Sequence, residues 1–393
     1  MYLRQLATDP DALFDSIVYT KRERRAPDRL AFFAGMDETG KVQLPEGDNP
    51  TVSAALSGLN KDMWWDAIFK EYESLIDRGT WEETTAPAEA NILPCHWVLK
   101  VKRDAMNNVE RFKARLVVGG NHQQEGVDFD KVFAPTSRYS TLRVFLALVA
   151  VENLEMHGLD VETAFLNGDL EEEVYMHPPK FFQSAAAGKV YRLRKALYGL
   201  KQAPRAWRLK LEEALRNLGY TESPGDPGLF YREVDGKRQY ILTFVDDCLM
   251  AASTMQELQA MKKELMEIFD CRDLGEPTSF LSMHIARDRT RRTISITQPK
   301  MVSEVLQVAR MTAARKVTTP LDPGTRFTKD GEPLDSKKYP YAVILGKLLY
   351  MSICTRPDLA YAVNVLTRFM QCPTMSRWHG LMHVCRYLFH IQT

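Results

Sequence analysis

Residues 239–252, with the sequence QYILTFVDDCLMAA, constrain the fold of this chain more than any other segment. Asp246 and Asp247 interrupt an otherwise apolar run, and an ionised carboxylate in apolar surroundings is costly unless it is paired, metal-bound or exposed. Residues 240–245 and 248–252 have the composition of buried strands, and the Asp-Asp pair fits the turn of a tight hairpin. The hairpin tip is then either an ordinary acidic turn or a pair of oxygen ligands for a hard cation such as Mg²⁺.

Length, charge and cysteine usage limit the remaining possibilities. The 393 residues suffice for two or three subdomains with their own cores, and 45% hydrophobic residues is ordinary for a globular protein. The net charge is +1, so a polyanionic partner would have to bind to local basic patches. The six cysteines form no C-x-x-C pair, which argues against a zinc ribbon and favours a reducing compartment. The N-terminus lacks signal-peptide order and the longest apolar run, 144–151, is too short to span a bilayer, so we expect an intracellular protein without membrane contact.

The spacing of apolar residues predicts helices and strands that mix without regular βαβ alternation. Helices are predicted at 61–81, 141–153, 204–220 and 254–269, and through the C-terminal third. Strands are predicted on both sides of a turn at 105–110, and at 154–161, 173–179, 189–200, 279–287 and 292–298. This mixture favours an α+β core with an antiparallel sheet. Residues 1–60 are charged and turn-rich, and we expect a loosely ordered leader or linker there.

A further acidic residue, Asp160 in MHGLDVETAF, follows a predicted strand. Aspartate is common as a cap of a helix or turn, and that interpretation stays open from the sequence alone. If the strand of Asp160 lies beside the hairpin, Asp160 and Asp246 could share two cations about 3.5–4 Å apart, the spacing of two-metal phosphoryl transfer. Asp247 would add charge to the same site, with a weaker claim to direct ligation than Asp246.

Two basic segments favour a polyanionic substrate. Residues 192–210 hold seven Lys or Arg and no acid, and residues 100–115 hold six basic residues against two acidic ones. Each segment could be a solvated face, but both are interleaved with aromatic residues and glycine, which suits phosphate contact and stacking. Gly199 would allow close approach of a backbone or a base.

Two other motifs do not support a function. GKLL at 346–349 lacks the earlier glycine of a phosphate-binding loop, because position 341 is tyrosine. His379 and His383 have the spacing of zinc ligands on a helix, but no glutamate follows His379, so the metalloprotease pattern is absent. We therefore expect these histidines to lie on a packed or solvated helix.

Many segments of the chain, in this order, resemble the reverse transcriptase of copia-type LTR retrotransposons. They include LDVETAFLNGDLEEEVYMHPP, LYGLKQAPRAW and FVDD. They also include TWEETTAPAEANILPCHWVLKVKRD, ERFKARLVVGGNHQQEGVDFDKVFAPTSR and LLYMSICTRPDLAYAVNVLTRFMQCP. The resemblance implies an RNA-directed DNA polymerase with a right-hand α+β fold. It implies fingers and palm over 61–310 and a helical thumb or connection region over 311–393.

The resemblance also assigns roles to individual positions. Asp160 matches the first palm aspartate, and Asp246 and Asp247 match the hairpin pair, which together bind two Mg²⁺, with Mn²⁺ as an alternative ion. Phe165 stands where the family places an aromatic residue that blocks a ribose 2′-hydroxyl; it could equally be an ordinary core residue. The residues that match the support of nucleotide and template are Gly199, Lys201, Gln202 and Pro204. The candidates for triphosphate contacts are Lys100, Lys102, Lys113 and Arg115.

The chain departs from the family pattern in three places. Phe244 replaces a common tyrosine before VDD, and Ser282, in a segment (280–285) that resembles the primer-grip hairpin, replaces glycine. After CRYL the sequence reads FHIQT instead of the usual Lys-Gly-Thr that leads into ribonuclease H, so we expect either a polyprotein fragment truncated before that domain or a decayed insertion.

The expected partners are an RNA template, a DNA or RNA primer and deoxynucleoside triphosphates, with ribonuclease H and integrase of the same polyprotein. The expected location is the cytoplasm, in a virus-like particle, or the nucleus. The alternative hypothesis is a non-catalytic remnant that keeps the fold and at most binds nucleic acid.

Overall fold

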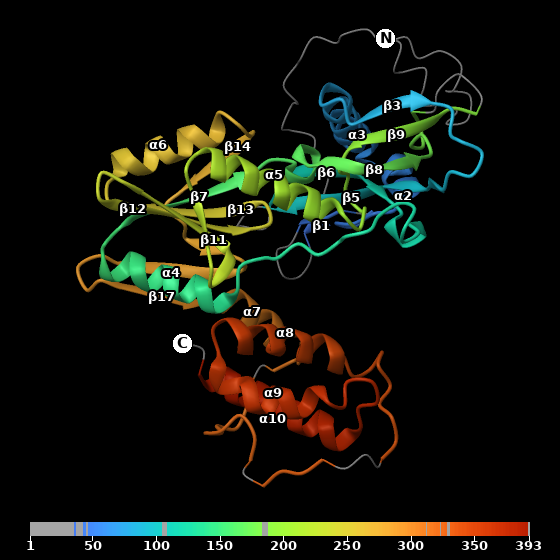
Figure 1. Cartoon of the computed structure of the whole chain (residues 1–393). Coiled ribbons are helices and arrows are strands. Elements are labelled where there is room, and N and C mark those ends of the chain that lie inside the picture. Colours follow the sequence, from blue (N-terminus) through green and yellow to red (C-terminus); the bar gives the residue numbers. More distant parts are fainter. Residues whose placement is uncertain are drawn as a thin grey trace. The chain divides into compact units, whose positions relative to one another are not determined.

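The computed structural model describes residues 35–36, 42–44, 46–103, 108–182, 188–311, 313–322, 324–327 and 331–391. The chain divides into two compact units (Figure 1). Unit 1 comprises Met1–Pro135 and Glu162–Gly219, and unit 2 comprises Thr136–Val161 and Tyr220–Thr393. None of the described helices is long and apolar enough to cross a membrane.

Unit 1 is built around a long helix that packs on a two-stranded ribbon. Helix α3 (Lys61–Asp77) buries Trp64, Ile68, Tyr72 and Leu75, which recur at helical spacing and form one face. The ribbon pairs β5 (Cys95–Arg103) with β6 (Val109–Val118), and its buried residues alternate with exposed ones, as expected for a ribbon covered on one side. A short helix, α2 (Val52–Ser57), precedes α3 and buries Ala55.

The rest of unit 1 holds a second sheet and a helix. The sheet has the order β3 (Trp81–Thr84), β9 (Val190–Lys195), β8 (Asp169–Met176) and β4 (Ile92–Leu93), and β4 runs parallel to β8. Helix α5 (Ala203–Asn217) follows β9, and the short helix η3 (Ala164–Asn167) precedes β8. The remaining elements are the pair β1 (Gly35–Met36) and β2 (Val42–Gln43) and the short helix η2 (Gly120–His122).

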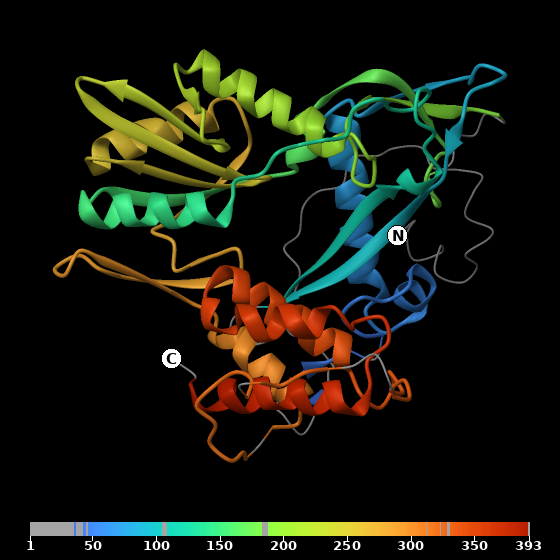
Figure 2. The same ribbon diagram turned by 60° about the horizontal axis from the view of Figure 1, so that its bottom comes forward.

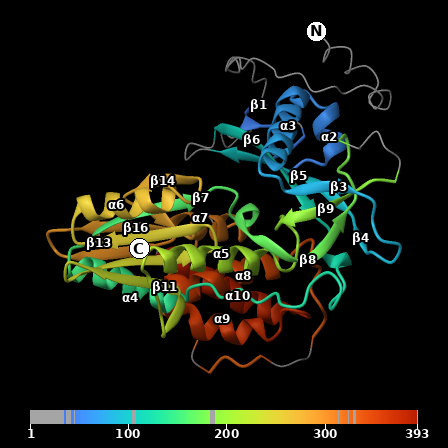
Figure 3. The same ribbon diagram turned by 45° about the horizontal axis from the view of Figure 1, so that its top comes forward.

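Among the residues that the structure describes, the largest sheet lies in unit 2 and has six antiparallel strands. Its order is β10 (Thr221–Ser223), β11 (Asp226–Val234), β12 (Lys237–Phe244), β13 (Asp247–Ala252), β7 (Glu155–Val161) and β14 (Cys271–Gly275). Helix α4 (Tyr139–Val151) packs on one face, with Leu142 and Phe145 in the same core cluster as Met156 and Leu249. Helix α6 (Met255–Met266) packs on β13, β7 and β14 (Figure 1 and Figure 3). Both faces of the central strands are therefore covered.

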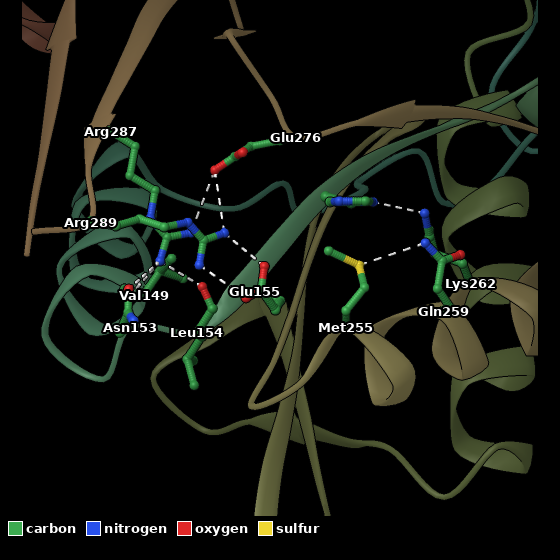
Figure 4. A network of polar contacts seen from close by, with 11 residues as sticks. Val149, Asn153, Leu154, Glu155, Met255, Gln259, Lys262, Glu276, Arg287 and Arg289 are labelled. Carbon is green, nitrogen blue, oxygen red and sulfur yellow. Dashed lines mark hydrogen bonds and ion pairs between the residues drawn. The ribbon is translucent and has the colours of Figure 1, made fainter.

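A three-stranded sheet follows in unit 2, with the order β15 (Ser279–Phe280), β16 (Met283–Asp288) and β17 (Thr293–Thr297). Its arginines hold it to α4 and β7 (Figure 4). Arg287 donates to the carbonyl oxygen of Leu154 at 2.7 Å, and Arg289 makes bonds of 3.0 and 2.7 Å to the two carboxylate oxygens of Glu155. A bidentate pair of this kind fixes the relative orientation of the guanidinium and the carboxylate as well as the distance between them.

Helices form the C-terminal part of unit 2, in orange to red in Figure 2. They are α7 (Pro299–Val308), α8 (Tyr341–Cys354), η4 (Pro357–Leu359), α9 (Ala360–Thr367) and α10 (Met375–His390). They share an apolar core in which Val305, Leu348, Val363 and Leu388 are buried. His383 lies in this helical part, and its Nε2 is 3.0 Å from the carbonyl oxygen of Thr319.

The structure confirms the α+β class and the antiparallel sheet, and it corrects details of the predicted elements. Order begins before residue 61, because α2 already lies at Val52–Ser57. The turn predicted at 105–110 falls largely outside the described residues, which resume at 108. The domain boundaries predicted at 60 and 310 remain predictions.

Candidate active site

The hairpin aspartates lie next to Asp160 in the large sheet. Asp247 on β13 is directly opposite Asp160 on β7, and Phe244 on β12 is directly opposite Asp247. Residues directly opposite in an antiparallel pair point to the same face with Cβ atoms about 4.5–5.5 Å apart. The predicted neighbourhood of the two acidic segments is therefore present in unit 2.

The turn of this hairpin differs from the prediction by one residue. Because Phe244 pairs with Asp247, the two turn residues are Val245 and Asp246, and Asp247 begins the next strand. Val245 has a φ of +59°, a conformation that a β-branched residue adopts only with strain. The carbonyl oxygen of Asp246 accepts a 2.9 Å hydrogen bond from the Val161 amide, which ties the turn to β7.

The surroundings of Asp247 disfavour its charge. Burial, and after it the neighbouring carboxylates of Asp246 and Asp160, together raise the pKa of Asp247 to about 6. The three acidic groups thus repel one another in a partly dry site. A bound cation would relieve this repulsion.

The three aspartates offer few protein ligands for a divalent metal. Among the described residues, no group of three or more His, Cys, Asp or Glu side chains is arranged to hold a metal ion. Mg²⁺ in phosphoryl-transfer sites usually takes one or two carboxylates, with waters and substrate phosphates as its other ligands. The opposed carboxylates of Asp160 and Asp247, with the raised pKa of Asp247, fit a Mg²⁺ site in which the protein supplies only one or two carboxylate ligands.

The opposite face of β7 carries a polar contact that the sequence did not indicate. The Lys262 ammonium, only 2% exposed, lies 2.8 Å from Nδ1 of His157 and 2.6 Å from Oδ2 of Asp273. Burial and the Lys262 charge lower the pKa of His157, which favours the neutral ring, and its Nδ1 can then accept a hydrogen bond from the ammonium. This contact ties α6 to β7 and to the edge strand β14, and no local pattern in the sequence marks it.

The remaining predicted site residues lie in unit 1. Gly199 has a φ of +97°, and a Cβ there would overlap the carbonyl oxygen of Val118 at the end of β6. The Val118 amide donates a 2.8 Å hydrogen bond to the carbonyl oxygen of Tyr198. The close approach expected at Gly199 is therefore made by the Val118 backbone, and only glycine fits at this position.

The residues after Gly199 are fixed by the segment that follows β6. The Gln202 side chain is buried and donates to the carbonyl oxygen of Asp128 at 2.8 Å. Lys201 is exposed, and its ammonium lies 4.5 Å from the centroid of the Phe129 ring. Pro204 occupies the first turn of α5, where its missing N–H costs nothing.

Phe165 is half-buried in η3, and its ring packs edge-on against Tyr198 with centroids 5.1 Å apart. The guanidinium of Arg115 lies 4.5 Å from the centroid of the same Tyr198 ring. The ordinary core role of Phe165 is therefore present, and its role towards a ribose stays a prediction.

The basic candidates of the ribbon share one face. Lys100 is directly opposite Lys113, and Val98 is opposite Arg115. Lys102 is opposite Arg111, which belongs to the same face although the sequence analysis did not single it out. The charges crowd together, and burial followed by the charges of Arg115 and Arg111 lowers the pKa of Lys113. Such a face suits a polyanion.

Comparison with known proteins shows the family of the chain. The model of the family described as reverse transcriptase (RNA-dependent DNA polymerase) matches residues 78–323. The Pol polyprotein of transposon TNT 1-94 from Nicotiana tabacum is 37% identical over 86% of this chain and 26% of its own length. That of transposon RE1 from Arabidopsis thaliana is 33% identical over 85% of this chain and 23% of its own length.

The chain thus spans about a quarter of the length of these relatives. Among solved structures, a foamy viral protease-reverse transcriptase in complex with an RNA/DNA hybrid has a TM-score of 0.43 and 14% identity, covering 83% of this chain and 37% of its own. The match to the family model covers well over half of the chain and includes the three aspartates. The chain belongs to the reverse transcriptase (RNA-dependent DNA polymerase) family, as a member of its copia-type retrotransposon branch.

Proposed function

We propose that this chain is the RNA-directed DNA polymerase of a copia-type retrotransposon and adds deoxynucleotides to a primer 3′-hydroxyl on an RNA template. The observation that carries the proposal is the register that sets Asp160 opposite Asp247, with Asp246 in the adjoining turn. We propose Asp160, Asp246 and Asp247 as ligands of two Mg²⁺ ions, with Mn²⁺ as an alternative.

In the proposed reaction the primer 3′-oxygen attacks the α-phosphorus of the nucleotide, and pyrophosphate leaves. When bound, the metal ions would lower the pKa of the attacking hydroxyl and neutralise phosphate charge. The chain's own task is to hold Asp160 and Asp247 on rigid neighbouring strands, so that little reorganisation is needed when charge develops. No side chain has to act as an obligatory base, because phosphoryl transfer depends mainly on position and charge.

In unit 1, the basic face of the ribbon is proposed to contact the triphosphate through Lys100, Lys102, Lys113 and Arg115. Phe165 is proposed to exclude a ribose 2′-hydroxyl, and the segment of Gly199, Lys201, Gln202 and Pro204 to support nucleotide and template. We further propose that the chain acts beside ribonuclease H and integrase of the same polyprotein, in a cytoplasmic virus-like particle or in the nucleus.

The test is Mg²⁺-dependent primer extension on an RNA template with Asp246→Asn. Incorporation should vanish while binding of the primed template survives, because the amide keeps the turn but removes a charged ligand. Asp235→Asn is the matched control, since Asp235 lies in another hairpin turn of the same sheet with a φ of +51°. An Asp246→Asn variant that extends as well as the parent would refute the metal assignment. Binding with a steep salt dependence but no incorporation by the parent would favour the non-catalytic remnant.

A further inference from the structure

Two tyrosine side chains form a chain of contacts beside the carboxylates. The Tyr350 hydroxyl, on α8, donates to the carbonyl oxygen of Leu281 at 2.6 Å. The Tyr139 hydroxyl, at the start of α4, donates to the Tyr350 hydroxyl at 3.3 Å, and the two rings pack edge-on with centroids 6.1 Å apart. The Tyr139 ring also lies 6.4 Å, between centroids, from the ring of Phe244.

One end of this chain of contacts is the carboxylate hairpin. Phe244 is the last residue of β12 and is directly opposite Asp247. Because opposed residues share a face, Phe244 lies on the same side of the sheet as Asp247 and Asp160. The core cluster on that face also contains Tyr139 and Tyr350.

The other end is the turn between β15 and β16. Phe280 pairs with Met283, so Leu281 and Ser282 form a two-residue turn with φ values of +47° and +61°. Such turns favour glycine or asparagine, and this one contains neither. A turn with unfavourable residues depends on contacts from outside, and the bond from Tyr350 to the Leu281 carbonyl supplies one.

The helix that carries Tyr350 is itself held at this end. Arg143 of α4 donates to the carbonyl oxygen of Cys354 at 2.8 Å, and also to that of Ile353. The Thr355 hydroxyl donates to the side-chain oxygen of Gln298 at 2.7 Å. Tyr350 is therefore on an anchored segment, and burial raises the pKa of both tyrosine hydroxyls, which keeps them protonated as donors.

We propose that Tyr350 is a positioning residue that fixes the β15–β16 turn relative to the carboxylate hairpin. Through this turn it supports the end of the polynucleotide that is extended at Asp160 and Asp247, so the inference rests on the proposed function. The hydroxyl is the essential group, because it alone reaches the Leu281 carbonyl. A tyrosine that only filled core volume would act through its ring, and phenylalanine would replace it without consequence.

The first measurement does not depend on catalysis. Hydrogen exchange of peptides spanning 279–285 is compared between the parent chain, Tyr350→Phe and Tyr361→Phe. Tyr361, on α9 and 74% exposed, is the matched control for loss of a hydroxyl. Exchange at the turn should be roughly fivefold faster in Tyr350→Phe, because one neutral hydrogen bond is lost, and it should be unchanged in Tyr361→Phe.

The second measurement separates positioning from nucleotide binding. In Tyr350→Phe, KM for the primed template should rise about fivefold, the equivalent of one hydrogen bond, while KM for the nucleotide stays within twofold. Tyr139→Phe leaves the Tyr350–Leu281 bond in place and should change KM for the primed template less than twofold.

Unchanged exchange at 279–285, an unchanged KM for the primed template, or an equal rise in both KM values would each overturn the role of Tyr350. The two KM outcomes presuppose a parent chain that extends primers, whereas the exchange measurement does not. A parent that extends none overturns the proposed function, and the positioning role with it. An active parent with an unaffected Tyr350→Phe overturns only the positioning role.

Discussion

Asp247→Asn is expected to stabilise the metal-free chain while it abolishes polymerase activity. Burial, together with Asp246 and Asp160, raises the pKa of Asp247 from 3.8 to about 6. At about 1.4 kcal/mol per pKa unit, ionising Asp247 at neutral pH costs the folded state at most about 3 kcal/mol. Asp247 is only partly buried, so solvent screens its charge. The free energy of unfolding of Asp247→Asn should therefore exceed that of the parent by only about 1 kcal/mol.

The sign of the pH dependence follows from the raised pKa. The folded state holds the Asp247 proton more tightly than the unfolded chain, so its contribution to stability is fully present below pH ~4. The contribution is lost as the pH rises through about 6. The asparagine variant does not titrate at position 247, so its gain in stability over the parent should be small at acidic pH and complete above pH ~7.

The assay is urea unfolding of both chains with a chelator, at about pH 5 and pH 7.5, and again at pH 7.5 with millimolar Mg²⁺. A cation that binds the folded carboxylates stabilises the parent more than the variant, so Mg²⁺ should narrow the difference between them. Asp235→Asn is again the control, in the turn at the end of β12 opposite to Phe244 and the carboxylate hairpin. A variant that is less stable than the parent at pH 7.5 in chelator, or a difference that does not change with pH, would refute the reasoning.

Three further predictions concern stability. Gly199→Ala should lower the free energy of unfolding by more than about 4 kcal/mol, or prevent folding, because a Cβ overlaps the Val118 carbonyl oxygen. Soluble yield and the urea midpoint measure this effect, and near-parental stability would contradict it. Ser282→Gly should raise the unfolding free energy by about 0.5–1 kcal/mol, because glycine adopts the φ of +61° without strain; an unchanged or lower midpoint would argue against strain at this turn. Asp273→Asn should lower the free energy of unfolding by about 2–3 kcal/mol, because the buried Lys262 side chain loses its counter-ion; thermal unfolding of this variant beside Lys262→Met, which we expect to be milder, tests the assignment.

Local pattern was enough to predict most helices and strands, because apolar periodicity and burial agree along the chain. The position of the hairpin turn was not predictable in the same way. Val245 is an apolar, β-branched residue that suits a strand, yet the pairing of Phe244 with Asp247 places it in the turn. Pairing register over the whole sheet overrides the local preference of that one residue.

The contacts that the sequence did not indicate join residues that are far apart along the chain. Lys262 meets His157 across 105 positions, and Tyr139 meets Tyr350 across 211. A single buried lysine or tyrosine carries no period and no motif, so only the fold shows which partner it has. Arg111 differs, since strand alternation and the pairing of β5 with β6 could have placed it on the basic face with Lys102.

The order of the strands in unit 2 bears on how the protein emerges from the ribosome. β7 lies between β13 and β14, which begin 86 and 110 positions after the end of β7, and the second segment of unit 1 is made in between. Unit 1 can therefore finish folding while α4 and β7 still lack most of their sheet. During that interval the edges of β7 are open to pairing with other chains, so slow translation between residues 162 and 252 should favour aggregation of the nascent polypeptide.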